Sequence, residues 1–202
     1  MNVYVESNFV LELALVQEQH ASCEQILSLC EAGDIRIIVP AYSIMEPYET
    51  LVRRHLDRKR LKEALDRELQ QLSRTSGYAQ QLDGFQASTA LLLDSAAEEI
   101  KRLEDLRSRL LACAGLIPLD TSILSEASRH QARHGLSAKD AIVYASVLSH
   151  LGSETAPQSC FLTRDTDFDD PDIVDELKAT RCKLIPRFDS GLSYVSAQLS
   201  RT

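Results

Sequence analysis

Acidic side chains stand at the ends of several short apolar runs in this chain, or open the helical patterns that follow them. Five positions share this placement: Glu6, Glu46, Asp140, Asp165 and Asp167. If the runs are parallel strands, their carboxyl ends and the following helix starts lie at one edge of a sheet, where α/β folds build their sites. We therefore expect four of these acids to converge, although they are spread over most of the chain.

Converging carboxylates have a definite chemistry. They repel one another, and the repulsion raises their pKa values unless a cation lies between them. A set of oxygen ligands without His or Cys suits Mg²⁺ or Mn²⁺ better than zinc. One or two such ions activate water and stabilise the leaving oxygen of an in-line phosphodiester displacement. The pattern therefore indicates nuclease chemistry that needs no protein nucleophile.

Most of these acids also have a purely structural explanation. Ser137 with Asp140 fits a capping box at a helix start. The acids from Asp165 onward are typical of turns, and Glu46 fits the first turn of a helix, where the dipole favours negative charge. Glu6 is harder to explain in this way, because it interrupts an otherwise apolar segment.

The elements that must position these acids can be read from the hydrophobic pattern. Five short apolar runs with little alternation are typical of strands buried on both faces: Val3–Val5, Ile35–Val39, Leu116–Leu119, Cys160–Leu162 and Lys183–Ile185. Helical patterns lie between them, at residues 8–15, 18–32, 46–73, 86–114, 121–134 and 138–151. Alternating strands and helices predict an α/β fold with a central parallel sheet.

The chain of 202 residues suits one domain and is short for two, so we expect a single domain over residues 1–202. Two long charged helical patterns add to the compact core, with a break bracketed by Gly77 and Gly84. They predict a helical insertion at about residues 55–113, exposed as a solvated hairpin or an oligomer surface.

The totals exclude several classes of protein. A formal net charge of −8 argues against binding nucleic acid by bulk electrostatics. No apolar run approaches the ~18 residues of a membrane span and no signal peptide is evident, so we expect a cytoplasmic protein without a membrane partner.

The sequence shows no disulfide framework or metal site at the cysteines and histidines. No CxxC pair occurs, so buried reduced thiols are expected for all five cysteines: Cys23, Cys30, Cys113, Cys160 and Cys182. Two of the five histidines, His130 and His134, share a helix face, but no third ligand is evident near them. We therefore expect solvated surface histidines.

Basic side chains near the acids offer a way to hold a polyanion. Arg53, Arg54 and Arg58 follow Glu46 in the segment LVRRHLDRKRLK, and Arg164 precedes Asp165. They fit either phosphate contacts with RNA or a solvated helix with ion pairs along its surface.

Four segments, in this order, resemble a PIN domain: NVYVESNFVL, VPAYSIMEPYETL, LSAKDAIVYASVL and FLTRDTDF. With the strands between them they cover residues 2 to about 187, apart from the helical insertion. The resemblance implies a single PIN-like domain with a central parallel sheet of about five short strands flanked by helices. It also implies a Mg²⁺- or Mn²⁺-dependent endoribonuclease.

Position by position, the resemblance implies a metal-binding and catalytic set of four acids: Glu6, Glu46, Asp140 and Asp165. Asp167 is the alternative for the fourth acid. Residues that support the site are implied as well: Ser7, Asn8 and Thr163. The implied partners are single-stranded RNA and a small antitoxin-like protein, as in toxin–antitoxin pairs. A second copy of the chain is the partner expected if the long charged helices form an oligomer surface.

One position departs from the family pattern, because Glu6 stands where the family usually has Asp. The extra methylene moves the carboxylate by roughly 1.5 Å, and a misplacement of ~1 Å can lower a rate by ~10²-fold. Two further hypotheses therefore stand beside the ribonuclease. One is a catalytically silent PIN-like module that binds RNA or a protein, and the other is a DNA-directed phosphodiesterase.

Overall fold

A computed structural model describes residues 1–75, 77–78, 85–153 and 158–201. Within these residues the chain forms a parallel sheet of five strands in the order β3-β2-β1-β4-β5. The strands are β1 (Asn2–Val5), β2 (Arg36–Pro40), β3 (Gly115–Ile117), β4 (Ser159–Leu162) and β5 (Cys182–Ile185). The five predicted strands are confirmed, although β3 ends two residues earlier than expected.

The central strands lack alternation because helices cover both faces of the sheet. Every residue of β1 and β4 is buried, and β2 is exposed only at Arg36. In the register of the sheet, Val3 of β1 lies between Ile37 of β2 and Cys160 of β4. The sheet therefore fixes its three middle strands in a dry environment, and chemistry is confined to its edges.

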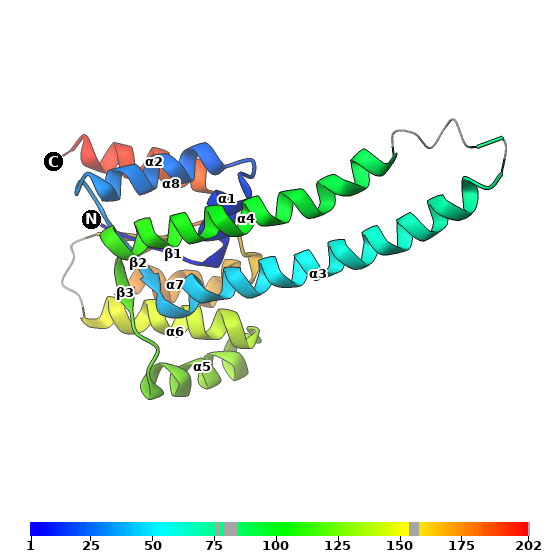
Figure 1. The fold of residues 1–202 in the computed structure, drawn as a ribbon. Coiled ribbons are helices and arrows are strands. Elements are labelled where there is room, and N and C mark those ends of the chain that lie inside the picture. Colours follow the sequence, from blue (N-terminus) through cyan, green and yellow to red (C-terminus); the bar gives the residue numbers. More distant parts are fainter. Residues whose placement is uncertain (76, 79–84, 154–157, 202) are drawn as a thin grey trace.

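Helices form a layer on each face of this sheet, as Figure 1 shows. The α-helices described are α1 (Ser7–Leu15), α2 (His20–Glu31), α3 (Ala41–Leu72), α4 (Phe85–Cys113), α5 (Thr121–His134), α6 (Ala138–Ser153), α7 (Pro171–Ala179) and α8 (Phe188–Leu199). A short 3₁₀ helix, η2 (Thr166–Asp169), precedes α7. The sequence patterns predicted six of these helices but missed α7 and α8, and α3 begins five residues earlier than expected.

Two hydrophobic clusters hold the layers together. One joins Val3 and Val5 of β1 to α1, α2, α4 and α8. The other joins Tyr4 of β1 and Phe161 of β4 to α5, α6 and α7. Successive side chains of a strand point to opposite faces, so β1 supplies both clusters.

The helices α3 and α4 form an antiparallel arm whose far part projects beyond the sheet (Figure 1). Leu61 and Leu91 in this far part are exposed. The C-terminal half of α4 differs, because Leu103 and Leu110 are completely buried in the first cluster. The predicted insertion is therefore part solvated arm and part core.

The cysteine prediction is confirmed and the histidine prediction is wrong. All five cysteines are free; four are buried and Cys113 is partly buried. None of the five histidines is exposed. His130 keeps only 8% of its surface and the His134 side chain 1%, because Tyr144 of α6 packs against both rings.

No helix among the described residues is both long and apolar enough to cross a bilayer.

Leu103→Ala should show that α4 is part of the core. The deletion leaves a cavity between α4 and the sheet, so we expect the free energy of unfolding to fall by about 2–5 kcal/mol in urea denaturation. Leu111→Ala, at a position that is 54% exposed on the same helix, should stay within about 0.5 kcal/mol of wild type. Equal losses in the two variants would contradict the division of α4 into a core face and a solvent face.

Candidate functional site

The switch point of the sheet lies between β1 and β4. From β1 the chain builds outward through β2 to β3, and it later returns to place β4 and β5 on the other side of β1. Adjacent strands whose connections run in opposite directions leave a crevice at their carboxyl ends. Glu6 directly follows β1, and the segment Thr163–Asp165 directly follows β4, so both reach this crevice.

A cavity of about 240 Å³ occupies this position, and four acids from four separate elements line it. They are Glu6, Glu46, Asp140 and Asp165. Among the described residues, Asp167 does not line the cavity; its backbone N–H donates to Asp165 Oδ1 at 3.0 Å. The expected convergence is therefore present for the first-choice set, and the turn expected at Asp165 is present too.

Glu6 is the most deeply buried of these acids, with 5% of its surface exposed. It caps α1, because Oε2 accepts the backbone N–H of Asn8 at 2.7 Å, and Oε1 accepts the hydroxyl of Thr163 at 3.1 Å. Desolvation outweighs these two bonds and raises the pKa of Glu6 to about 8, and the charges of Asp165 and Glu46 raise it further. Glu6 is therefore held in place but reluctant to ionise alone.

Thr163 connects the two sides of the crevice. Its hydroxyl donates to Glu6 and accepts the backbone N–H of Asp165 at 3.0 Å. Thr163 itself is completely buried. Ser7 and Asn8 also line the cavity, and Asn8 contributes the N–H described above.

Asp140 lines the cavity and also interacts with Ser137 at the start of α6. Its backbone N–H donates to Ser137 Oγ at 3.3 Å, and the Ser137 hydroxyl donates to Asp140 Oδ2. The predicted interaction of these two residues at the start of α6 is thus confirmed. Partial burial, reinforced by the charges of Asp165, Asp167 and Glu46, raises the pKa of Asp140.

Glu46 meets a cation that sequence reasoning missed. Lys139 Nζ lies 2.8 Å from Glu46 Oε1, and the bond raises the pKa of Lys139. Because α3 begins at Ala41, Glu46 lies in the second turn, so the first-turn dipole explanation is wrong. Lys139 and Tyr42 also line the cavity. The only sequence signal for Lys139 was its place directly before Asp140.

The donor set fits a hard divalent cation. Four carboxylates and one ammonium group line the cavity within the described part of the chain, and no imidazole or thiol does. Such an excess of oxygen donors is what Mg²⁺ and Mn²⁺ prefer. No three of these carboxylates bring oxygens within 4.8 Å of one another among the described residues, which agrees with their mutual repulsion.

The four predicted arginines differ in what they contact. Arg58 of α3 pairs with Glu99 of α4 at 2.9 Å, which braces the arm. Arg164 pairs at 2.6 Å with Glu12, whose side chain is 1% exposed. Arg53 and Arg54 are exposed on α3.

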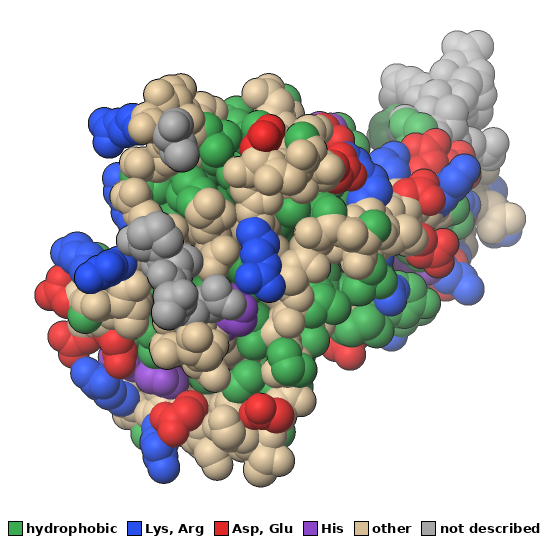
Figure 2. Space-filling view, turned by 90° about the vertical axis from the view of Figure 1, so that its left-hand side faces the viewer, with side chains coloured by type: hydrophobic (Ala, Val, Ile, Leu, Met, Phe, Trp, Pro, Cys, Tyr) green, Lys and Arg blue, Asp and Glu red, His purple; other side chains and the backbone are tan. Residues whose placement is uncertain are grey.

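The face of the molecule away from the arm mixes charges of both signs. Basic and acidic side chains are interspersed there with apolar ones (Figure 2). A nucleic acid needs a continuous basic surface for binding by bulk electrostatics. The visible side chains of this face do not supply one.

A family model described as PIN domain matches residues 3–168, which is most of the chain. The chain belongs to the PIN-domain family. No curated protein matches the chain significantly. The match includes residues 3–5 of β1, the whole of β4 and all four acids of the cavity, so it covers the elements that build the site.

Arg164→Gln should destabilise this PIN domain by removing the partner of buried Glu12. We expect a loss of about 2–3 kcal/mol in urea denaturation, less than for a fully buried pair because Arg164 is partly exposed. Arg129→Gln, which removes an exposed pair with Glu126, should change stability by less than about 0.5 kcal/mol. Equal stability of Arg164→Gln and wild type would contradict the role of Arg164 as the partner of Glu12.

Glu6→Gln should make the metal-free PIN domain less sensitive to pH. The unfolded chain loses the Glu6 proton near 4.5 and the folded chain near 8, so wild-type stability falls as the pH rises between these values. In the presence of a chelator, the variant should be close to wild type at pH 5 and more stable by up to about 4 kcal/mol at pH 8. Thermal melts across this range measure the difference. With exposed Glu104→Gln as the control, a parallel pH response of all three proteins would contradict the raised pKa.

Proposed function

We propose that this PIN domain is a metal-dependent endoribonuclease that hydrolyses RNA phosphodiester bonds at the carboxylate cavity. The observation that supports this most is the convergence of Glu6, Glu46, Asp140 and Asp165 on one cavity at the switch point of the sheet. The resemblance to PIN domains implied nuclease chemistry with divalent ions, and the chain belongs to that family. In this proposal the four acids hold Mg²⁺ or Mn²⁺, and the ions supply a Lewis acid and lower the pKa of water.

The residues of the chain have separate tasks in this proposal. Thr163 and the N–H of Asn8 hold the Glu6 carboxylate, so that its longer side chain keeps one position. Ser137 does the same for Asp140. Lys139 pairs with Glu46 and so offsets part of the negative charge that the four acids bring to the cavity.

Arg53 and Arg54 are the arginines that we propose for contact with the RNA backbone. Both are exposed, and they follow Glu46 on the same helix by about two turns. Arg53 is near enough to the cavity to influence the pKa of Lys139. Arg58 and Arg164 are left out of this set, because Glu99 and Glu12 already neutralise them.

A specific observation favours a second candidate, a catalytically silent module that binds RNA or a protein. Burial raises the pKa of Glu6 above neutrality, so the metal-free site carries one negative charge fewer than four carboxylates suggest. The exposed leucines of the α3–α4 arm, Leu61 and Leu91 among them, would then supply the contact with an antitoxin-like protein or a second copy.

Cleavage of a mixed single-stranded RNA in the presence of Mn²⁺ tests the first proposal. Asp140→Asn removes a charge from the cavity while keeping the contact with Ser137, so we expect the rate to fall by about 100-fold or more. Asp120→Asn is the matched control: Asp120 caps α5 through the N–H of Ile123, and Asn caps equally well. Equal rates for wild type and Asp140→Asn would place the activity elsewhere.

Glu6→Asp separates the two candidates. If the longer side chain limits an otherwise complete site, the shorter acid should raise the rate. If no member of the series cleaves RNA while wild type still binds it, the silent module is supported. A parallel reaction with single-stranded DNA distinguishes a ribonuclease from a DNA-directed phosphodiesterase.

A further inference from the structure

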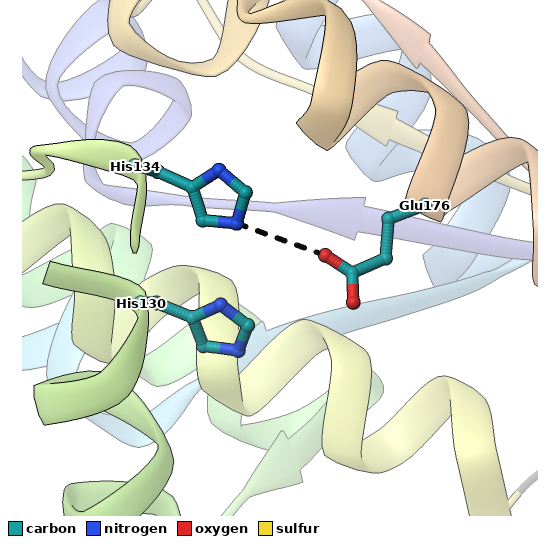
Figure 3. A group of neighbouring side chains, drawn as sticks. All are labelled: His130, His134 and Glu176. Carbon is teal, nitrogen blue, oxygen red and sulfur yellow. Dashed lines mark ion pairs between the residues drawn. The ribbon is translucent and has the colours of Figure 1, made fainter. Parts of the chain in front are cut away.

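A second group of potential metal ligands lies on the opposite face of the sheet from α1, between α5 and α7. It consists of His130, His134 and Glu176, whose ligand atoms lie within 4.8 Å of one another. His130 and His134 are four residues apart on α5, so their side chains share one face of the helix. Glu176 reaches the same point from α7, and Figure 3 shows the two rings beside its carboxylate.

Packing alone does not account for this group. Tyr144 contacts the two rings edge-on, with ring centroids 4.8 and 5.9 Å away, which explains why the rings are buried. It does not explain their nitrogens. His130 Nδ1 and His134 Nε2 are buried without a hydrogen-bond partner among the described residues. Buried polar atoms nearly always have a bonding partner. Two neighbouring nitrogens without one therefore indicate that a group outside the protein binds both.

The separations suit an ion. His134 Nε2 lies 3.9 Å from Glu176 Oε2, too far for a hydrogen bond. Two ligands that each lie 2.0–2.1 Å from a tetrahedral ion are about 3.4 Å apart, so binding requires these two atoms to approach by about 0.5 Å. The hydroxyl of Tyr144 donates to Glu176 Oε2 at 2.8 Å, as outer groups do for carboxylate ligands.

We propose that His130, His134 and Glu176 bind a zinc ion. Two imidazoles and one carboxylate form a donor set that zinc accepts, with a fourth position left for water. His130 and Glu176 also line a cavity of about 490 Å³, together with Arg129 and Arg133. Arg133 Nη1 lies 3.8 Å from Glu176 Oε1, so an ion at this site has to share the Glu176 carboxylate with Arg133. The site is separate from the carboxylate cavity and differs in chemistry, because Mg²⁺ prefers oxygen ligands and seldom binds imidazole.

The nearest alternative shares one ligand with this site. His134 also lies within 4.8 Å of carboxylate oxygens of Asp170 and Asp172 at the start of α7. Asp170 already caps α7 by accepting the N–H of Asp172 at 2.8 Å, and Asp172 is exposed. The group with two buried imidazoles is therefore the stronger zinc site.

Zinc binding by the full chain tests the proposal. Titration against a chromophoric chelator, with millimolar Mg²⁺ present to occupy the carboxylate cavity, should give one equivalent of bound Zn²⁺. His134→Gln and Glu176→Gln should each weaken binding by about 100-fold or more. The control His20→Gln, on α2, should bind like wild type, and thermal melts in chelator check that every variant is folded.

Three outcomes would overturn the proposal. The first is a wild-type protein that binds no Zn²⁺ in the presence of Mg²⁺. This result contradicts the proposal whether or not the variants fold. Loss of binding in Asp172→Asn but not in Glu176→Gln places the ion in the alternative group. Co²⁺ in place of Zn²⁺ should show visible bands of a nitrogen and oxygen site. Intense thiolate charge-transfer bands would instead assign the ion to the cysteines.

Discussion

The main constraint on this structure is that several carboxylates lie together in the crevice at the carboxyl ends of β1 and β4. Buried carboxylates close together are unfavourable, and each must be held against the repulsion of the others. In this chain, the hydrogen bonds that hold three of these carboxylates are made at the starts of helices. Glu6 caps α1, Asp140 interacts with the Ser137 that opens α6, and Asp165 accepts the N–H of Asp167 at the start of η2. The structural and the functional explanations of these acids are therefore compatible, because a carboxylate has several acceptor positions.

Two arginines also have a structural role, because each pairs with carboxylates of another element. Arg164, which follows Thr163 directly, neutralises buried Glu12 of α1, so an ion pair fixes the segment after β4 beside the site. Arg109 of α4 bridges Glu24 and Glu31 of α2. The Arg109 contacts tie the base of the arm to the core. Both arginines are therefore occupied by carboxylates of the chain itself and are less available to a polyanion.

The sequence was sufficient for the sheet and for the convergence of the four acids on one cavity, because buried parallel strands have a strong local signature and the acids follow from strand ends. It was weaker where the outcome depended on distant partners. Lys139 was missed since its bond to Glu46 spans 93 positions. The start of α3 was placed five residues too late, and Pro47 lies inside the helix that begins at Ala41. His130 and His134 looked solvated because the residue that buries their rings, Tyr144, comes from another helix.

The α7 segment shows how these features join. Asp165 is followed at once by η2, whose Phe168 is buried against Tyr144 and Phe161, and then by α7, which carries Glu176. One short stretch of chain thus runs from an oxygen-donor cavity at the sheet edge to an imidazole group on α5. Tyr144 contacts both ends of this stretch, through its ring at Phe168 and its hydroxyl at Glu176. Contacts that hold α7 against α5 therefore also restrict the segment that carries Asp165. The reason is that close-packed side chains transmit displacements to their neighbours.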